Sequence, residues 1–486
     1  MGTVMTIERD AATAVDTVCI SVLGAERRAA ALAGGRVVGF AIDDPRDAIR
    51  AGDIILGRVT GTRPALGAAF VDIGSARPGI LMADDSRRPV GEGEAVIVQV
   101  RRQPEGGKGA RLSTRLRLAG RFLVCRPGQP GIDISRRVAD KAERDRLTTV
   151  VQAIASEATA GIAPGAAEDI GWTAGHRALA ADPAALAADA RDLLSAWRGI
   201  GHAAGAAGPV PRPLRPADSP VDRLLDRAAE PALARVLIDD ADTLLAIRRR
   251  FPALADRLHH HRDARPLFDA TGVTDDMAEA LGRWIDLDGG GRLAITETEA
   301  LVTIDVDTAS ADEGAPEATA LKVNQAAAAA IGRLVRLLDL AGTLIVDPVP
   351  LRRTANRARV VRALKAAFAD DGAHVDVAGY TRLGLIEFQR EKQAPSLLRR
   401  LTTTCPACDG AGRVGDPVVL AHDALRDAVA AGRHAPHLPP RLTVSEDVAA
   451  ALNGPAQASH AWAEGRLGRP IDIDLSTGRR RGWPSP

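Results

Sequence analysis

Short runs of apolar and β-branched residues dominate the first hundred positions of the chain. Apolar and polar residues alternate around Val18-Cys19-Ile20-Ser21-Val22, which predicts strand, turn and strand within residues 1–50. Four further runs, separated by Gly, Pro and Asp, lie at residues 54–61, 68–74, 79–82 and 95–100. Short strands in such close succession predict a small β-barrel, a fold that usually binds its ligand on its face and loops.

Strand and helix patterns alternate between residues 285 and 400. Apolar runs predict three strands, at residues 300–307, 343–347 and 379–388. Helical spacing predicts a helix from Thr319 to Leu340 that Gly342 ends, and a second helix that runs from an N-cap at Thr354 to about Ala369. This alternation implies an α/β layer.

The middle of the chain is less regular. Residues 118–200 mix short strand patterns with Ala-rich helical spacing, and residues 202–216 are dense in Gly, Ala and Pro. The second stretch predicts a linker or a domain edge. His259, His260 and His261 are expected at an exposed helix end, because three adjacent helical residues cannot all face one metal ion.

Length and composition indicate a multidomain globular protein. The 486 residues exceed what one core accommodates, and 46% of them are hydrophobic. No run approaches the ~20 apolar residues of a membrane span, and the N-terminus lacks a signal-peptide pattern, so we expect a cytoplasmic protein. Lys and Arg (63) balance Asp and Glu (62), so any contact with nucleic acid must come from local basic clusters.

Acidic residues lie at the ends of two predicted strands. Thr303, Asp305 and Asp307 share one face of the first strand, because side chains alternate along a strand, and Asp347 closes the next. Ligands in open α/β sheets bind beyond the C-terminal strand ends, and magnesium is typically held by one or two carboxylates. The pattern is compatible with a magnesium site, but taken alone it favours carboxylates that cap helices or pair with arginines.

The four cysteines do not form a disulfide framework in so long a chain. Cys19 and Cys125 lie in apolar runs and are expected in the core. Cys405 and Cys408 form a Cys-x-x-Cys pair, which supplies two of the four ligands of a structural zinc ion. Gly410 and Gly412 favour a zinc-knuckle turn there, while a redox pair and an empty relic are the alternatives.

Several motifs, in collinear order, resemble the ribonuclease E/G family of bacterial endoribonucleases, and the short ribonuclease G type in particular. The segment Thr298-Glu-Ala-Leu-Val-Thr-Ile-Asp-Val-Asp resembles the family's catalytic strand, and Leu344-Ile-Val-Asp its second metal-binding aspartate. The resemblance continues through Gly57-Arg-Val-Thr, Ala68-Ala-Phe-Val-Asp-Ile-Gly, Gly107-Lys-Gly-Ala-Arg-Leu, Gly131-Ile-Asp-Ile-Ser-Arg-Arg, Trp172-Thr-Ala-Gly, Thr381-Arg-Leu-Gly-Leu-Ile-Glu, Cys405-Pro-Ala-Cys and Gly468-Arg-Pro-Ile.

The resemblance implies an α/β multidomain fold with one domain inserted into another. A split RNase H-like domain would comprise residues 1–52 and 214–278, with an S1-type OB RNA-binding barrel (53–117) and a 5′-sensor region (118–213) between its parts. A DNase I-like catalytic domain (279–400), a zinc-link (401–415) and a small C-terminal domain (416–486) would follow.

The resemblance also implies hydrolysis of single-stranded RNA with a magnesium ion held by Asp305 and Asp347. Substrates would be ribosomal RNA precursors and messenger RNA. Asp307 lies where the family has an asparagine that orients the scissile phosphate or the attacking water. Aspartate lacks the amide donor and adds a negative charge, so we expect slower catalysis unless Asp307 serves as a third metal ligand.

On the barrel, Phe70 matches the family's base-stacking aromatic residue and Lys108 a lysine that contacts RNA; the alternative for Phe70 is a place in the barrel core. A second family aromatic is replaced by Ile80. The basic residues after Asp347 are expected to line an RNA path or to form a solvated helix face: Arg352, Arg353, Arg357, Arg359, Arg362 and Lys365.

The family shares one zinc ion between two subunits, which implies a homodimer that could pair further into a tetramer. The chain stops at residue 486 without the long tail of ribonuclease E, so a degradosome scaffold is not expected. The main alternative is an RNA-binding protein that keeps the fold with a degenerate active site, as Asp307 and Trp172 suggest. A zinc-dependent redox protein built on Cys405 and Cys408 would leave every other motif unexplained.

We predict weak discrimination of the RNA 5′ end. The family's 5′-monophosphate pocket uses an Arg-Thr pair and a later arginine; here the pair is Trp172-Thr173, and Arg382 fits the later arginine. An indole offers one N–H and no charge, whereas a guanidinium grips phosphate with paired hydrogen bonds. Substrates with 5′-monophosphate and 5′-hydroxyl ends should be cleaved equally; a strong preference for the monophosphate would contradict this prediction.

Overall fold

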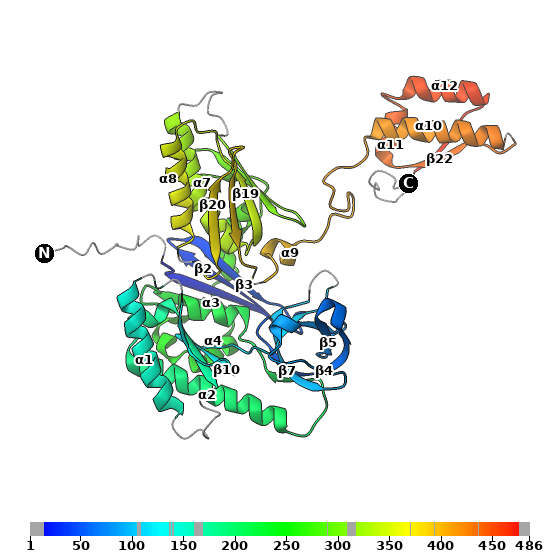
Figure 1. The fold of residues 1–486 in the computed structure, drawn as a ribbon. Helices are drawn as coiled ribbons and strands as arrows, with labels where there is room; N and C mark the ends of the chain where they lie inside the picture. The colour runs from blue at the N-terminus through cyan, green and yellow to red at the C-terminus, as the bar shows by residue number, and fades with distance from the viewer. Residues whose placement is uncertain are drawn as a thin grey trace. The chain divides into compact units, whose positions relative to one another are not determined.

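The computed structural model describes residues 14–104, 108–135, 138, 140–159, 169–288, 290–308, 317–369, 371–392, 394–435 and 437–475. The chain divides into two compact units, residues 1–398 and 399–486. The first unit is a mixed α/β assembly of four sheets, and the second is a small α/β unit (Figure 1). Within the described residues, no helix combines the length and apolar character that a membrane crossing requires.

The first sheet joins two segments that are distant in sequence. Its order is β15-β14-β1-β2-β3, formed by Leu258–His260, Arg235–Ile238, Thr17–Leu23, Glu26–Ala33 and Arg36–Asp43. Strands β1 and β14 pair in parallel. The chain leaves this sheet at Asp43, where β3 ends, and returns to it some 190 residues later at Arg235, where β14 begins. Helices α3 (Pro220–Ala228) and α4 (Ala241–Arg250) begin at the side-chain caps Ser219 and Asp240.

The predicted barrel is confirmed. Strands β4 (Ile54–Arg63), β5 (Ala68–Asp72), β6 (Gly79–Met82), β8 (Arg111–Ser113) and β7 (Ala95–Arg102) form a ring that the β4–β7 pairing closes, so the barrel is five-stranded and OB-like. Alternate residues fill its interior, among them Val59, Val71, Leu81 and Val98. A side chain at Gly57 would meet Val71 Cγ1 at 2.6 Å, which explains glycine at this close approach.

The next region contains a four-stranded sheet. Its strand order is β11-β12-β10-β9, formed by Ile132–Ile134, Ile170–Ala174, Leu123–Pro127 and Leu118–Ala119. Helices α1 (Lys141–Thr159) and α2 (Pro183–Gly205) accompany it. The prediction of a linker at residues 202–216 was therefore wrong in part. Residues 202–205 end α2, and β13 (Arg212–Arg215) pairs with barrel strand β4, because Ala continues a helix and Pro213 is tolerated on an edge strand.

The α/β layer predicted between 285 and 400 is a six-stranded sheet. Its order is β16-β17-β18-β19-β21-β20, formed by Ile285–Asp286, Arg292–Glu297, Val302–Asp307, Gly342–Asp347, Ile386–Arg390 and Val375–Tyr380. Helices α7 (Glu317–Leu337) and α8 (Thr354–Ala367) lie side by side along this sheet (Figure 1). The sheet's buried face includes Ile304, Val306, Leu344 and Val346.

Four local predictions were wrong. Residues 379–388 are not one strand: β20 and β21 flank a turn in which the Gly384 N–H donates to the Thr381 carbonyl. Helix α7 ends at Leu337, before Gly342, and Asp339 takes the left-handed conformation at φ 47°. Thr354 is the first residue of α8 rather than its cap. The histidine run belongs to strand β15 and the residue after it, not to a helix.

The second unit has its own small core. Helices α10 (Pro417–His434), α11 (Glu446–Leu452) and α12 (Gln457–Leu467) accompany a parallel pair of strands, β22 (Arg441–Val444) and β23 (Asp472–Leu475). Leu425, Leu442 and Leu452 are among its buried residues. The first residues of this unit, 399–416, include the end of the short helix α9 (Leu397–Leu401) and the Cys-x-x-Cys motif.

Trp172 lies in the core of the region between the barrel and α3. Its side chain is 2% exposed and belongs to a cluster that includes Leu123, Leu147 and Leu194. On strand β12 it pairs with Cys125 of β10 and Ile132 of β11, so sheet neighbours flank it on both sides. A buried indole cannot contact RNA in this conformation. This placement corrects the assignment of Trp172 as an RNA-binding residue and favours the core alternative.

Truncation of Trp172 should therefore act on stability. We predict that Trp172→Ala lowers the free energy of unfolding by about 3–5 kcal/mol, because it leaves a cavity in a closely packed cluster. Urea denaturation measures this difference. Trp462, which is 64% exposed, provides the control: Trp462→Ala should change the free energy by no more than about 0.5 kcal/mol. Equal effects of the two substitutions would contradict the prediction.

Candidate functional site

Asp305 and Asp347 are direct neighbours on adjacent strands. Strands β18 and β19 run in parallel, and Asp305 pairs in register with Asp347. Each residue is exposed, whereas the alternate positions Ile304 and Val346 are buried beneath the sheet. Helix α7 connects the two strands, so both carboxylates lie at the same edge, beyond which ligands of α/β sheets bind.

These two carboxylates form an uncompensated pair of like charges. In the described part of the chain, neither the Asp305 carboxylate nor the Asp347 carboxylate accepts a hydrogen bond or forms an ion pair. Neighbouring strands are about 4.8 Å apart. Two negative charges at ~4 Å repel by about 1 kcal/mol in bulk water and by more at lower dielectric. A cation between them would relieve this repulsion.

The donor set fits magnesium. Magnesium is commonly held by one or two carboxylates, with water and substrate phosphates as its remaining ligands. Within the described residues, no group of three or more His, Cys, Asp or Glu side chains is arranged to hold a metal ion. The pair therefore suits an ion that keeps open positions for water and phosphate, and it does not resemble a closed structural site.

Side-chain contacts hold both ends of this arrangement. Before β18, Thr298 Oγ1 accepts hydrogen bonds from the N–H groups of Ala300 (3.3 Å) and Leu301 (3.1 Å), which turns the chain into the strand. After β19, the buried Asn324 of α7 donates to the Val349 carbonyl (2.8 Å) and accepts from its N–H (3.0 Å). Asn324 thus fixes the backbone two residues after Asp347, a role that the sequence did not indicate.

Asp307 has a partner that the other two aspartates lack. Arg292, opposite it on β17, donates from Nε (3.0 Å) and Nη2 (2.8 Å) to Asp307 Oδ2. The Arg292 guanidinium also lies 4.0 Å from the ring centroid of Trp284, a cation–π contact. Arg292 therefore offsets the negative charge of Asp307 at the same sheet face that carries Asp305 and Asp347.

Further charged groups surround the pair. Glu387 of β21 is exposed on the same sheet face, opposite Ile345, and sequence reasoning gave it no role. The alternation of buried and exposed residues along β21 is the signal that could have identified it. Arg352 and Arg353 are exposed in the loop that follows Asp347. Hydrogen bonds from the Arg353 N–H and the Asn356 side chain lower the pKa of Glu317, which anchors this loop.

The barrel presents Phe70 on its outer side. Phe70 is half-buried, whereas its neighbours Ala69 and Val71 fill the interior, so the barrel-core alternative does not describe it. Ile80 is its direct partner on β6. Lys108 is exposed, and no described hydrogen bond or ion pair engages its ammonium group. Both residues are accessible to a ligand on the barrel.

Thr173 and Arg382 lie on different sheets. Thr173 is half-buried on β12, and Arg382 is exposed in the tight turn between β20 and β21. No hydrogen bond joins the two in the described residues. Arg382 has no hydrogen-bond or ion-pair partner there either, so its guanidinium remains available for an anion.

The Cys-x-x-Cys motif forms a tight turn. The Gly412 N–H donates to Cys408 Sγ (3.3 Å), and Asp409, Gly410 and Gly412 all have positive φ. Cys405 is exposed and Cys408 half-buried, so a ligand can reach both thiols. Cys19 and Cys125 are buried, as predicted, and burial raises the pKa of Cys125 to about 12.

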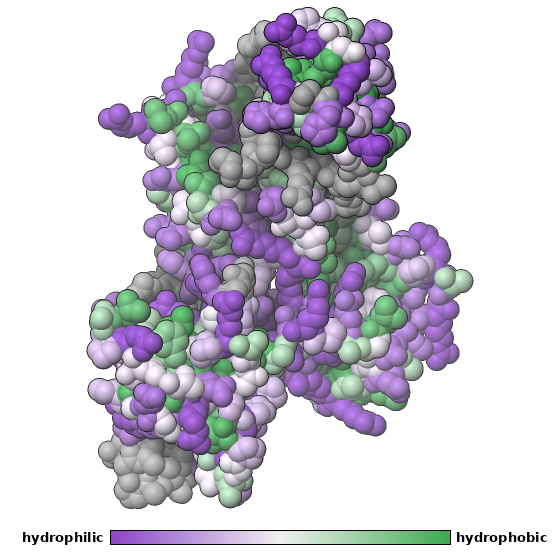
Figure 2. Space-filling model, turned by 90° about the vertical axis from the view of Figure 1, so that its right-hand side faces the viewer, coloured by the Kyte–Doolittle hydropathy of each residue, from purple (hydrophilic) through white to green (hydrophobic). Residues whose placement is uncertain are grey.

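The surface contains no sign of one dominant apolar interface on the face that Figure 2 shows, where hydrophilic and hydrophobic residues are interspersed. Exposed large hydrophobic residues lie far apart in the described sequence, for example Leu23, Leu66, Leu245 and Leu383. The charged groups described above therefore distinguish the candidate site better than hydropathy does.

Comparisons with known proteins identify the family of the chain. The Ribonuclease E/G family profile matches residues 117–393, which include Asp305, Asp307 and Asp347. Ribonuclease G of Escherichia coli K12 is 30% identical over 94% of this chain and 96% of its own length. Ribonuclease G of Haemophilus influenzae is 30% identical over 78% and 80%. Ribonuclease E of E. coli K12 is also 30% identical, over 82% of this chain but 39% of its own length. The chain belongs to the ribonuclease E/G family.

Proposed function

We propose that this protein is an endoribonuclease that hydrolyses phosphodiester bonds of single-stranded RNA with a magnesium ion held by Asp305 and Asp347. The observation that carries the proposal is the in-register pair of carboxylates at the C-terminal ends of the central strands β18 and β19, which have no hydrogen-bond or ion-pair partner among the described residues. The names of the relatives, ribonuclease G and ribonuclease E, support the reaction class. Ribosomal RNA precursors and messenger RNA are the proposed substrates, in the cytoplasm.

The chain's own residues would bind and orient the RNA around that ion. Bound magnesium would supply Lewis-acid activation of water and offset charge on the scissile phosphate. Asp305 and Asp347 would hold it from one side of the sheet and leave the solvent side open for the RNA. Arg352 and Arg353 are exposed directly after Asp347 and would contact flanking phosphates. Arg359, Arg362 and Lys365 are exposed on α8, where a solvated helix face accounts for them.

Asp307 and Arg292 together would act on the substrate phosphate. An aspartate alone would repel that anion, but Arg292 offsets its charge through two hydrogen bonds to one carboxylate oxygen. The third guanidinium nitrogen, Nη1, makes no hydrogen bond in the described residues and can donate to a phosphate oxygen. The Asp307–Arg292 pair therefore offers the phosphate a hydrogen-bond donor and carries almost no net charge. An isolated aspartate would offer no donor and would carry a negative charge. This pairing argues for an active site over a degenerate one.

The domain assignments extend this proposal. The discontinuous first sheet supports a split RNase H-like domain at 1–52 and 214–278, and the closed barrel supports an S1-type domain at 53–117. Thr173 of residues 118–213 would sense the RNA 5′ end together with Arg382 of residues 279–400, without Trp172. Residues 279–400 would form the DNase I-like catalytic domain. Phe70 would stack on a base, which is worth ~1–3 kcal/mol, and Lys108 would contact the backbone.

We further propose that the zinc-link at 401–415 joins two subunits. Cys405 and Cys408 supply two thiolates, while structural zinc requires four ligands. The N–H to Sγ hydrogen bond at Cys408 favours a thiolate that binds metal. A second copy of the chain would complete the site, which gives a homodimer or a dimer of dimers. The small domain at 416–486 follows this link.

The central prediction concerns magnesium-dependent cleavage. A fluorogenic, single-stranded, AU-rich RNA should be cut with magnesium and not with EDTA. Asp305→Ala should reduce the rate at least about 100-fold, because metal-ion catalysis contributes several kcal/mol to transition-state stabilisation. Glu299, next to the Thr298 turn, provides a matched carboxylate outside the pair, and Glu299→Ala should retain activity.

Two outcomes would contradict this account. If folded wild-type protein binds the RNA and never cuts it, the degenerate RNA-binding alternative is correct. If Asp305→Ala cuts as fast as the wild type, the carboxylate pair is not the catalytic site, whatever the activity of the protein.

The Asp307–Arg292 pair makes a separate prediction. Arg292→Gln should slow cleavage about tenfold in the wild-type background, because it exposes the charge of Asp307 to the substrate phosphate. In the Asp307→Asn background the same change should cost much less, since the negative charge that Arg292 offsets is then absent. Rates of all four proteins form a double-mutant cycle, in which contacting residues are non-additive. Equal costs of Arg292→Gln in both backgrounds would refute the coupling.

A further inference from the structure

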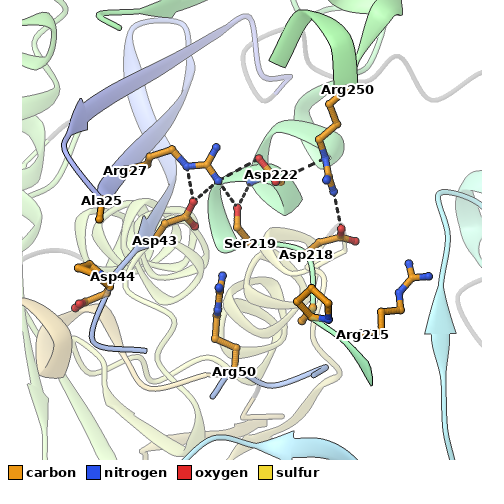
Figure 3. Close-up of a pocket in the computed structure, with 13 residues that line it drawn as sticks. Ala25, Arg27, Asp43, Asp44, Arg50, Arg215, Asp218, Ser219, Asp222 and Arg250 are labelled. Carbon is orange, nitrogen blue, oxygen red and sulfur yellow. Dashed lines mark hydrogen bonds and ion pairs between the residues drawn. The ribbon is translucent and has the colours of Figure 1, made fainter. Parts of the chain in front are cut away.

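A second charged site lies in the first unit, beside the first sheet. Two connecting loops of the chain approach each other there. The residues of the site line a cavity of about 600 Å³ that is open to solvent (Figure 3). One connection, 44–53, leads from β3 into the barrel; the other, 216–219, leads from β13 to α3. The first turn of α3 and the last residue of α4 complete the lining. The cavity is separate from the sheet that carries Asp305 and Asp347.

The aspartates of this cavity already have cationic partners. Arg27 donates from Nε to Asp43 (2.8 Å) and lies 3.4 Å from Asp222. Arg250 pairs with Asp218 (2.5 Å) and lies 3.6 Å from Asp222. Dashed lines in Figure 3 join these groups and Ser219, which caps α3. Two guanidinium groups thus pair with three carboxylates of the cavity, and the fourth, Asp44, pairs with Arg46.

Two arginines of the same cavity are not engaged. Arg50 and Arg215 are half-buried and line the cavity, and neither guanidinium has a hydrogen-bond or ion-pair partner among the described residues. In Figure 3 the Arg50 side chain extends into the space below Asp43 and Ser219. Burial lowers the pKa of the neighbouring Arg223; the positive charges of Arg227 and Arg50 lower it further, whereas the carboxylates of Asp218 and Asp43 raise it, so charges of both signs gather here.

The backbone around these arginines is fixed by one carboxylate. Asp53 accepts hydrogen bonds from the N–H of Arg50 and the N–H of Ala217, both at 2.7 Å, and so ties the two connections together. A side chain at Gly52 would meet Ala217 Cβ at 2.9 Å, which shows how closely they approach. The positions of Arg50 and Arg215 are therefore preorganised, which reduces the entropy lost when a ligand binds.

We propose that Arg50 and Arg215 form a binding site for a nucleotide phosphate. Guanidinium groups recognise phosphate oxygens through paired, charge-assisted hydrogen bonds. A cavity of this volume lies within the range of about 300–1,000 Å³ typical of small-molecule sites, so it accommodates one nucleotide unit. The N-terminal end of α3 adds a favourable dipole at the same cavity.

The location favours a phosphate of a bound RNA strand over a free nucleotide. Arg215 pairs in the sheet with Ile54, the first residue of barrel strand β4, so the site adjoins one end of the barrel. A strand that contacts the barrel could extend its backbone into the cavity. The inference that the phosphate belongs to a bound RNA strand rests on the proposed function. The inference that the two arginines bind a phosphate group does not.

Binding measurements in EDTA test the proposal on the full-length protein. Fluorescence anisotropy of a 5′-labelled single-stranded RNA should give an affinity about three- to tenfold weaker for Arg50→Gln/Arg215→Gln than for the wild type. The slope of log affinity against log salt should fall by about 0.7 for each phosphate contact removed. Arg28→Gln is the matched control, because Arg28 lies beside Arg27 but pairs with Glu26 outside the cavity.

The source of the phosphate is decided by a second arm. If RNA binding is unchanged, inorganic phosphate or adenosine monophosphate should raise the melting temperature of the wild type and not that of the double variant, which assigns the site to a free ligand. Identical RNA affinity, salt slope and ligand-induced melting shift in both proteins would overturn the proposal. Should the double variant fail to fold by circular dichroism, the two single variants serve instead.

Failure of this proposal and failure of the proposed nuclease are distinguishable. Every measurement above is made without magnesium, and it can be repeated with Asp305→Ala, which removes a carboxylate on a different sheet. A protein that never cuts RNA but loses affinity on substitution of Arg50 and Arg215 would keep the phosphate site and lose the nuclease. A protein that cuts RNA but is indifferent to both substitutions would do the reverse.

Discussion

The parallel register of β18 and β19 is the constraint on which the candidate site depends. It places two aspartates opposite each other at a sheet edge, where nothing in the described chain offsets their charge. An apolar layer beneath the sheet, with Ile304, Leu344 and Val346, fixes that register, because a slip by one residue would bury the carboxylates and expose the apolar side chains. The same alternation that stabilises the fold therefore places two like charges on neighbouring strands, where a cation can bind.

The surrounding structure maintains this arrangement from several directions. Asn324 fixes the chain after Asp347, and the Thr298 turn leads into β18. Arg292 offsets the charge of Asp307, the carboxylate that would otherwise add a negative charge facing the substrate. At the other end of the sheet the buried Arg390 bonds Asp371 and Asp339, which anchors the edge strands. Removing one partner of such a buried pair is typically costly, at about 3–5 kcal/mol.

Local patterns along the sequence predicted most of the regular structure. The barrel, the α/β layer, the buried Cys19 and Cys125, and the facing aspartates follow from alternation and strand order. Features that depend on partners distant in sequence were missed: the Asp307–Arg292 pair requires the β17–β18 register, and the Arg50 and Arg215 cavity requires two connections to cross. The burial of Trp172 likewise follows from its sheet neighbours on β10 and β11. Asp339 adopts the left-handed conformation, which glycine usually occupies. Hydrophobic periodicity cannot reveal a position of this kind.

The most direct test of the central claim is to locate the metal. Manganese can replace magnesium in oxygen-ligand sites and is visible by anomalous scattering. A crystal of the protein soaked in manganese should show an anomalous peak between the carboxylates of Asp305 and Asp347, lost in crystals of Asp347→Asn. A peak elsewhere, or a wild-type crystal with no peak at these two residues, would contradict the account.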